Sequence, residues 1–356
     1  MDSLVALRKY YSQKTVLVTG HTGFKGTWLC FVLKLLGAKV VGIGLRPKYI
    51  PNAFSILQLA ERVIDYSEFV DIRDKNHLES VFDIHKPEVI FHLAAQALVK
   101  DSYDDPVDTY STNVMGLVNV FEACRITSSV QSVVNVTSDK CYENFEWIYP
   151  YRENDRLGGK DPYSCSKACS ELITKSYKVS FFQNTALSSA RAGNVIGGGD
   201  WSDNRLIPDL VKAAQAGSVV QIRSPNSIRP WQHVLEPIIG YLLLGMIHAE
   251  KNECQGAWNF GPTHFNVKTV KEVVKLFEKN LGAGELSNFA SVSATFHEAQ
   301  LLNLDSTKAM HILGWQPRWD IEESVHKTAQ WYKAFYENQD MMALTIAQIE
   351  DYLKVR

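Results

Sequence analysis

The stretch VLVTGHTGFKG, Val16–Gly26, decides how this chain begins to fold. A short apolar run leads directly into glycines at positions 20, 23 and 26. Such a run followed by G-x-x-G-x-x-G spacing is typical of a strand, a tight turn and the first turn of a helix. Glycines let backbone N–H groups approach a diphosphate, and a helix N-terminus favours its negative charge. The stretch therefore predicts a turn that binds a dinucleotide.

The same rhythm continues along the first half of the chain, where short apolar runs alternate with amphipathic helical patterns. Alternation of this kind is typical of a parallel sheet covered by helices on both faces. We therefore predict an α/β protein with a Rossmann-like, doubly wound parallel sheet. The predicted strands are 14–19, 38–43, 68–71, 88–93, 130–136 and 185–190, and the predicted helices are 26–37, 74–85, 106–127 and 162–182.

The pattern changes after Gly193. Loops become longer and richer in glycine, proline, tryptophan and asparagine, as in GNVIGGGDWSDNRLIPD (193–209). This change predicts two domains. Residues 1–193 would form the dinucleotide-binding domain and residues 194–356 mainly a smaller substrate-binding domain, with part of 229–260 returning to the first.

Composition excludes several classes of protein. The chain has 356 residues, 21% of them charged, and a formal net charge of −2, so neither nucleic acid nor an anionic membrane is an expected partner. No signal peptide is visible, and the most apolar segment, 237–249, is too short to span a bilayer. Six cysteines without paired spacing favour a reduced, cytoplasmic compartment. The histidines show no metal-ligand spacing, so we predict no metal.

The candidate cofactor site extends beyond the glycine turn. Many such folds place an acid after the second strand to bind the adenosine ribose, but this chain has Arg46 there. Because Arg46 and Lys25 would suit a 2′-phosphate, NAD and NADP both stay open from the residues alone. Asp71 and Ile72, after the third strand, would hold the adenine edge. The cofactor-binding residues predicted are Gly20, Thr22, Gly23, Phe24, Lys25, Gly26, Asp71, Ile72, Leu93, Ala94, Ala95, Gln96, Asn113, Tyr163 and Lys167.

A second constellation carries acid–base groups. Asp161-Pro162 predicts a helix start, with a capping carboxylate followed by proline at the first helical position. Tyr163 and Lys167 then stand at i and i+4, on one helical face. An ammonium beside a phenol would lower the pKa of the tyrosine and make it a usable base. In VTSDKCYE (136–143), a predicted strand ends in a hydroxyl pair, an acid and an amine.

Together these motifs resemble the extended short-chain dehydrogenase/reductases. More narrowly, TSDKCYEN (137–144) and RAGNVIGGGDW (191–201) resemble the CDP-glucose 4,6-dehydratases of bacterial deoxysugar (O-antigen type) synthesis, and the resemblance runs from about residue 14 to residue 335. It implies an NAD-dependent hydro-lyase that acts on CDP-glucose. Such enzymes oxidise the sugar C4 hydroxyl, eliminate water between C5 and C6, and return the hydride to C6.

The resemblance also implies roles for single residues. Tyr163 would be the C4 base, oriented by Lys167, and Thr137 would hydrogen-bond the C4 oxygen. Asp139 would protonate the departing C6 hydroxyl. The substrate-binding residues implied are Gln96, Thr137, Asn194, Arg229 and Asn259.

Lys140 departs from the related dTDP-glucose dehydratases, which have a glutamate there. A lysine could take the C5 proton only as a neutral amine, which burial or nearby cations would have to favour. Alternatively, its charge could stabilise the enolate. The base and stabiliser roles both stay open.

Two other functions remain possible at this stage. A nucleotide-sugar 4-epimerase would share Tyr163, Lys167 and Thr137 but would not use the acid and amine at 139 and 140. A dinucleotide-sensing protein without catalysis would usually lose the tyrosine or the lysine, and this chain keeps both. The resemblance further implies a homodimer formed through the helices predicted at 106–127 and 162–182.

Overall fold

The computed structural model describes residues 3–250, 255–263, 268–289 and 300–354. Its centre is a seven-stranded sheet in the order β11-β6-β5-β4-β1-β2-β3, with every neighbouring pair parallel. The predicted fold class is therefore confirmed. The strands are β1 (Thr15–Thr19), β2 (Lys39–Gly44), β3 (Tyr66–Phe69), β4 (Val89–His92), β5 (Ser132–Val136), β6 (Ala186–Arg191) and β11 (Gly256–Asn259).

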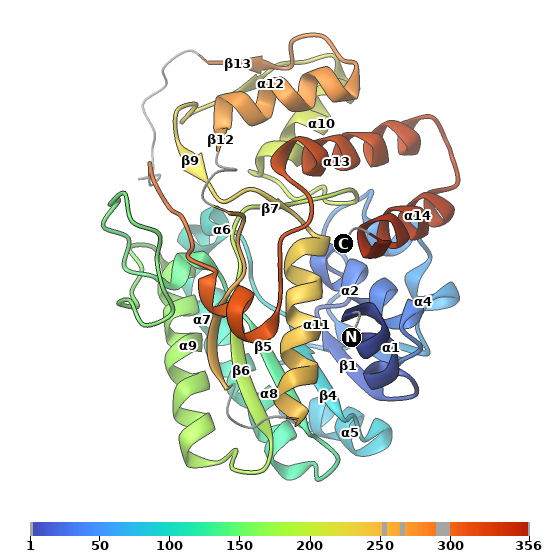
Figure 1. Ribbon diagram of the computed structural model, residues 1–356, viewed down its shortest axis with the longest axis vertical. Helices are drawn as coiled ribbons and strands as arrows, with labels where there is room; N and C mark the ends of the chain where they lie inside the picture. The colour runs from blue at the N-terminus through green and yellow to red at the C-terminus, as the bar shows by residue number, and fades with distance from the viewer. Residues whose placement is uncertain (1–2, 251–254, 264–267, 290–299, 355–356) are drawn as a thin grey trace.

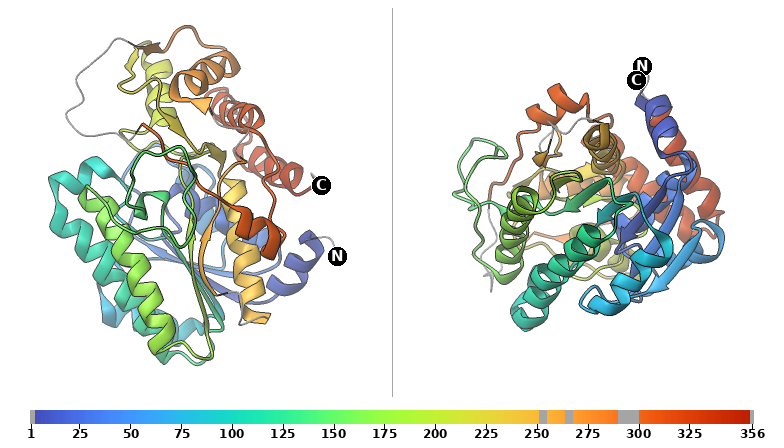
Figure 2. Two further views of the ribbon diagram at one scale, coloured as in Figure 1. Left: turned by 60° about the vertical axis from the view of Figure 1, so that its left-hand side comes forward. Right: turned by 90° about the horizontal axis from the view of Figure 1, so that it is seen from below.

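Helices cover both faces of this sheet, as Figures 1 and 2 show. Successive strand residues enter opposite cores, because side chains alternate across a strand: Val16 and Val18 pack in one core and Leu17 in the other. The first core receives α1 (Ser3–Tyr11), α2 (Phe24–Leu35) and α11 (Leu235–Glu250). The second receives α5 (Lys75–His85) and α8 (Leu117–Ile126), with α9 (Pro162–Ser180) partly buried against it.

The helix predicted at 106–127 is built in three pieces. It comprises α7 (Pro106–Tyr110), a π-helical turn η1 (Ser111–Gly116) and α8. The wider turn lies where Asn113 reaches toward α9, and π turns of this kind often mark functional sites. Shorter helices are α3 (Ala53–Ile56), α4 (Leu59–Arg62), α6 (Val99–Asp104) and η2 (Asp139–Cys141).

The remaining elements gather beyond the carboxyl ends of the sheet strands, at the top of Figure 1. Parallel strands leave their ligand-binding loops at this edge, so a site formed there lies between the sheet and these elements. They are β7 (Val195–Ile196), α10 (Leu206–Ala216), β8 (Val220–Gln221), β9 (Ile228–Arg229), β10 (Gln232–His233), β12 (Lys268–Thr269), α12 (Val270–Leu281), β13 (Ser287–Asn288), α13 (Ile321–Tyr336) and α14 (Met341–Lys354). One exception, η5 (Ala309–Leu313), lies lower in the view, against α11.

Two differences from the sequence prediction concern strands. The third strand lies at Tyr66–Phe69 rather than 68–71. A seventh strand, β11, had not been predicted; it pairs with β6 and lies within the part of the chain expected to return to the first domain. Across the described residues, no helix is both long and apolar enough to cross a membrane.

Candidate active site

The glycine turn has the geometry that close approach to a diphosphate requires. Gly20 has a φ of +77°, and a Cβ there would lie 2.7 Å from the backbone nitrogen of Ala94. A Cβ on Gly26 would lie 2.1 Å from the carbonyl oxygen of Gly20. Helix α2 begins after Gly23 without a side-chain cap, so its first N–H groups are left to a ligand. The residues present therefore fit a dinucleotide diphosphate.

The turn after β4 is fixed against β1 by one side chain. The Thr19 hydroxyl accepts hydrogen bonds from the backbone N–H groups of Leu93 (3.2 Å) and Ala94 (3.1 Å). Thr22 donates to the Leu45 carbonyl (2.7 Å), which ties the glycine turn to the end of β2. Leu93 and Ala94, together with Thr22, Phe24 and Lys25 from the other segment, are half-buried around the same edge of the sheet.

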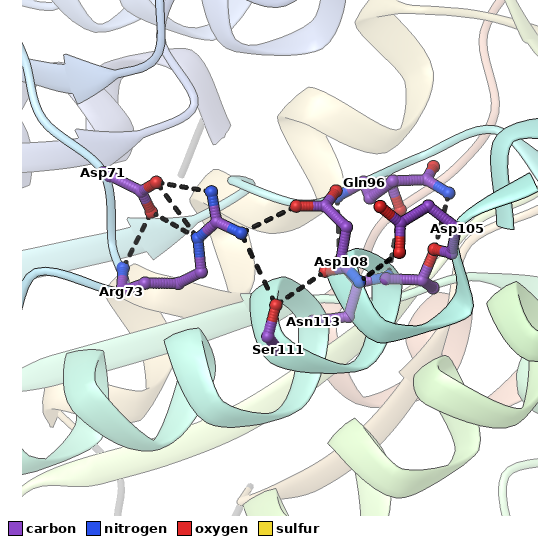
Figure 3. A network of polar contacts seen from close by, with 8 residues as sticks. Asp71, Arg73, Gln96, Asp105, Asp108, Ser111 and Asn113 are labelled. Atoms are coloured by element: carbon purple, nitrogen blue, oxygen red, sulfur yellow. Dashed lines mark hydrogen bonds and ion pairs between the residues drawn. The ribbon is translucent and has the colours of Figure 1, made fainter.

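Figure 3 shows a polar network at the predicted adenine end. The Arg73 guanidinium bridges Asp71 (2.6 Å) after β3 and Asp108 (2.6 Å) on α7. The Arg73 side chain holds the pKa of the Asp71 carboxyl below its usual range. Asp71 is therefore a fixed, ionised acceptor that lies where the prediction placed an adenine contact. Ile72 beside it is buried.

Asn113 connects the β4 loop to α9, and Figure 3 draws it together with Gln96 of that loop. The Asn113 side chain accepts from the Gln96 backbone N–H (2.8 Å) and donates to the Gln96 carbonyl (2.9 Å) and the Ser166 hydroxyl (2.9 Å). The Gln96 side-chain amide donates hydrogen bonds to the Leu98 carbonyl and the Thr109 hydroxyl, and its oxygen accepts one from the Leu98 N–H. Both side chains are thus engaged within the protein and shape the loop after β4; the ligand contacts predicted for them stay predictions.

Helix α9 carries the predicted tyrosine and lysine. Asp161 caps it by accepting from the Ser164 N–H (2.9 Å), and Pro162 occupies the first turn, as predicted. Tyr163 and Lys167 are both buried, at 8% and 7% exposure. The cap therefore sets the start of the helix, and the helix places both groups on one face.

The end of β5 corrects the predicted hydroxyl. Thr137 is directed into the protein, where its hydroxyl donates to the Glu171 carboxylate. The Ser138 hydroxyl, one residue later, lies close enough to Tyr163 to lower the pKa of the phenol. Successive side chains leave an extended backbone on opposite sides, so only one of the two hydroxyls can face the helix tyrosine. Ser138, which the sequence reasoning missed, occupies the position predicted for Thr137.

Asp139 is held in a tight and partly unsatisfied environment. Its side chain is 3% exposed, and Oδ1 accepts from the Ser138 hydroxyl (2.9 Å). Among the described residues Oδ2 has no hydrogen-bond partner, which is unusual for a buried carboxylate oxygen. A Cβ on Gly193 would lie 1.9 Å from that oxygen. Glycine at 193 is thus what makes room for Asp139.

Lys140 differs from Asp139 in its exposure to solvent. It belongs to the same short turn, but its side chain is exposed. The protein by itself therefore does not desolvate the amine, which was one of the two conditions under which a lysine could act as the C5 base.

The pKa values of the buried groups oppose one part of the prediction. Burial raises the pKa of Tyr163 to about 12, and the hydrogen bond to Ser138 offsets this only in part. The expected lowering of the tyrosine pKa by Lys167 is not found: Ser138 and the Arg205 charge lower this pKa, and the loss of solvation outweighs both. Burial lowers the pKa of Lys167 to about 8. Burial, together with the nearby charges of Arg205 and Lys167, also lowers the pKa of Lys25 to about 8.

Arg205 is a second residue that the sequence reasoning missed. It precedes α10, donates to the Ala97 carbonyl (3.3 Å), and acts electrostatically on both Tyr163 and Lys25. Its Nε is buried without a partner among the described residues. Arg205 thus places a positive charge over the site, and it belongs to the elements that gather beyond the strand ends. Arg205 lies within residues 193–209, a stretch whose loop-rich composition stands out in the sequence. That composition was the signal that could have pointed to Arg205.

The predicted substrate residues divide into two groups. Asn259 is fully buried: it accepts from the Tyr142 hydroxyl (2.8 Å) and donates to the carbonyls of Tyr151 (2.8 Å) and Asp305 (3.1 Å). It is therefore an internal bridge, and the predicted substrate contact is wrong for its side chain. Asn194, with a φ of +43°, and Arg229 are both half-buried beyond the strand ends.

Comparisons with known proteins identify the family. Residues 17–328 match the family model described as GDP-mannose 4,6 dehydratase. A CDP-glucose 4,6-dehydratase from Salmonella typhimurium is 43% identical over 97% of this chain and 98% of its own length.

Solved structures share the fold. The NAD complex of a UDP-glucose 4-epimerase from Brucella ovis has a TM-score of 0.77 at 22% identity, covering 90% of this chain and 98% of that one. A dTDP-glucose 4,6-dehydratase from Bacillus anthracis in complex with NAD has a TM-score of 0.76 at 21% identity, covering 92% and 99%. With the length and identity of these matches, the chain belongs to the extended short-chain dehydrogenase/reductases, within the GDP-mannose 4,6 dehydratase family of nucleotide-sugar dehydratases and epimerases.

Proposed function

We propose that the protein converts CDP-D-glucose to CDP-4-dehydro-6-deoxy-D-glucose and water, with NAD as its resident cofactor. The 43% identity to a CDP-glucose 4,6-dehydratase over nearly the whole chain supports the substrate. The observation that carries the reaction type is the buried Asp139 beside Ser138 and Tyr163, with one carboxylate oxygen unpaired. A dehydratase needs an acid at that point.

The residues for the cofactor are the glycine turn, the end of β3 and the end of β4. Bound NAD would accept a hydride from sugar C4 and return it to C6. On the protein side, the uncapped N-terminus of α2 would bind the diphosphate, and Asp71 would receive the adenine edge. Lys167 would hold the nicotinamide ribose.

Oxidation at C4 would begin with proton removal by Tyr163. Because burial raises its pKa to about 12, the tyrosine needs added positive charge to act at neutral pH. Lys167 and Arg205 are the cations that the chain supplies nearby. Ser138 would hydrogen-bond the C4 oxygen and hold it against the phenol.

Elimination follows because the C4 ketone acidifies the C5 hydrogen. Asp139 would donate a proton to the C6 hydroxyl as it leaves. Lys140 would act at C5, either by taking the C5 proton or by stabilising the enolate that its removal forms. Its exposure in the protein alone favours the second role.

A 4-epimerase on the same scaffold is the second candidate, since relatives with that name share the family. It would need Tyr163 and Ser138 but has no use for Asp139, whose burial is costly without a function. The enclosed carboxylate therefore favours the dehydratase.

Substrate contacts, assembly and location complete the proposal. Arg229 would bind the diphosphate, since guanidinium groups pair phosphate oxygens bidentately, and Asn194 would contact the sugar diphosphate. The second domain would supply both residues and close over the first domain. The protein would act in the cytoplasm.

A homodimer would cover exposed apolar side chains on α7, η1 and α9, namely Val107, Met115, Leu172 and Val179.

The experiment that tests the reaction and substrate together is a nucleotide-sugar panel. The protein is incubated with NAD and separately with CDP-, dTDP-, UDP- and GDP-glucose, and the 4-keto-6-deoxy product is followed by NMR. Product from CDP-glucose alone is expected. Product from another nucleotide would overturn the substrate, and C4 inversion without dehydration would establish the epimerase instead.

Lys140→Ala is expected to stop elimination while C4 oxidation continues. Reduced cofactor should accumulate, and product formation should fall by about 10²-fold or more. Absorbance at the nicotinamide band and product NMR measure the two steps. Lys140→Arg separates the roles, because arginine keeps the charge but cannot act as a neutral base. Activity in Lys140→Arg supports enolate stabilisation, and its loss supports a base. Lys333→Ala, an exposed lysine on α13, is the control.

Gly193→Ala should have the same phenotype for a steric reason. The new methyl group would lie 1.9 Å from Asp139 Oδ2, so the carboxylate must move. Misplacement of a catalytic group by about 1 Å can cost about 10²-fold in rate. Gly284→Ala is the matched control, since a Cβ there meets nothing within 4 Å. Wild-type product formation by Gly193→Ala would show that the position of Asp139 is not critical.

A further inference from the structure

Glu171 occupies a buried position behind the catalytic groups. It lies on α9 one turn after Lys167, and its side chain is 3% exposed, as is that of Arg191 at the end of β6. Glu171 Oε2 accepts from Arg191 (2.7 Å) and from the Ser189 hydroxyl (2.6 Å). Glu171 Oε1 accepts from the hydroxyl of Thr137. The pair thus reaches the residue immediately before Ser138.

Arg191 reaches the other end of the same turn. Its NH1 donates to the Tyr142 hydroxyl (2.7 Å), and its guanidinium lies 4.8 Å from the centre of the Tyr142 ring. Thr137 and Tyr142 directly flank residues 138–141, which contain Ser138, Asp139 and Lys140. One buried ion pair therefore contacts both ends of the catalytic turn and, through Glu171, the helix that carries Tyr163 and Lys167.

We propose that the Glu171–Arg191 pair is a positioning device that holds the catalytic turn 138–141 at both ends and fixes it relative to helix α9. The proposal rests on the dehydratase function, because it assigns work to groups of that site. A buried ion pair is a weak source of stability, since desolvation offsets its attraction, and its geometric specificity is the more useful property. Here the pair fixes the geometry between the turn 138–141 and helix α9, which must both reach the substrate.

The charges around Lys167 give the pair a second effect. Glu171 and Cys141 act to raise the pKa of Lys167, whereas burial lowers it to about 8. Burial raises the pKa of the Cys141 thiol well above its usual value, so the thiol is neutral. The Lys167 charge in turn lowers the pKa of Lys25 and of His92, and burial is the larger cause in both, taking the pKa of His92 to about 3. Glu171, kept ionised by Arg191 in spite of burial, is thus the anion that supports the ammonium.

Four conservative substitutions separate positioning from stability. Thr137→Val removes the contact to Glu171, and Tyr142→Phe removes the hydrogen bonds to Arg191 and to Asn259; both variants leave the ion pair in place. Each is expected to lower kcat about 10-fold or more with little change in KM, and Thr137→Ser should restore activity. Ser189→Ala is the matched control, because it removes a hydrogen bond to Glu171 that does not reach the turn. Wild-type kcat in the first two variants, or an equal loss in Ser189→Ala, would overturn the proposal.

Glu171→Gln adds a readout that a purely structural role would not change. If Glu171 supports the charge on Lys167, its neutralisation lowers the pKa of Lys167. The alkaline limb of the pH–rate profile for C4 oxidation then moves to lower pH, whereas Thr137→Val leaves the limb in place. A limb that stays fixed in folded Glu171→Gln contradicts the coupling. If this variant does not fold, the three hydroxyl variants decide the proposal.

The same coupling can be read without substrate. A protein labelled with ¹³C at lysine Cε allows Lys167 to be titrated by NMR, with Lys167→Arg identifying its signal. A lower pKa in Glu171→Gln supports the coupling even if no nucleotide sugar is turned over. Failure of the dehydratase function and failure of this inference therefore give different results.

Discussion

Tyr163→Phe is expected to abolish C4 oxidation, lowering product formation by about 10²–10⁴-fold. The phenol is the group on α9 that Ser138 contacts, and phenylalanine keeps the buried ring while removing the proton acceptor. Because oxidation is the first step, reduced cofactor should not accumulate. Stopped-flow absorbance of the nicotinamide after mixing with CDP-glucose measures this step directly.

The control is a tyrosine outside the site. Tyr336→Phe, near the end of α13, loses a hydroxyl that bonds Gln215 (3.2 Å) and should keep wild-type rates. Binding of NAD and CDP-glucose to Tyr163→Phe, measured by calorimetry, should remain within a few-fold of wild type. Rapid cofactor reduction in Tyr163→Phe would assign the C4 base to another group.

Asp139→Asn is expected to block the reaction one step later. Asparagine has nearly the same shape and can still accept the Ser138 hydrogen bond, but it cannot protonate the leaving hydroxyl. Product formation should fall by about 10²–10⁴-fold while reduced cofactor accumulates. This pattern is the opposite of that expected for Tyr163→Phe, so the two variants order the chemistry.

Solvent exchange at C5 separates Asp139 from Lys140. In deuterium oxide, Asp139→Asn should still incorporate deuterium at C5 of the bound sugar, because proton removal there does not depend on the acid. Lys140→Ala should not. Absence of C5 exchange in Asp139→Asn would mean that Asp139 itself takes the C5 proton. Full product formation would remove it from the mechanism.

Much of the fold was accessible from spacing along the chain. The glycine turn and the α9 start were predicted because each depends on residues within a few positions of one another, and the structure has both. β3 was displaced by two residues, since a short strand at a sheet edge has a weak apolar pattern. β11 was missed as a strand because its place depends on pairing with distant β6.

The choice of the active-site hydroxyl likewise depends on contacts between segments that are distant in the sequence. Thr137 and Ser138 are adjacent and chemically alike, so no local rule chooses between them. Glu171 takes the Thr137 hydroxyl from behind the turn, and that contact joins residues 34 positions apart. Asn259 was misassigned for a related reason: its amide meets Tyr142 and Tyr151, more than 100 residues away.

The sequence by itself thus determined the parallel α/β fold, the glycine turn before α2 and the placement of Tyr163 and Lys167 on one helical face. These follow from periodicity and from side chains one helical turn apart. Only the tertiary structure decided that Ser138 faces the tyrosine, that Gly193 makes room for Asp139, and that Glu171 and Arg191 hold the turn between them. Those contacts arise where separate strands and helices meet, and steric exclusion and buried charge between distant segments leave no local pattern in the chain.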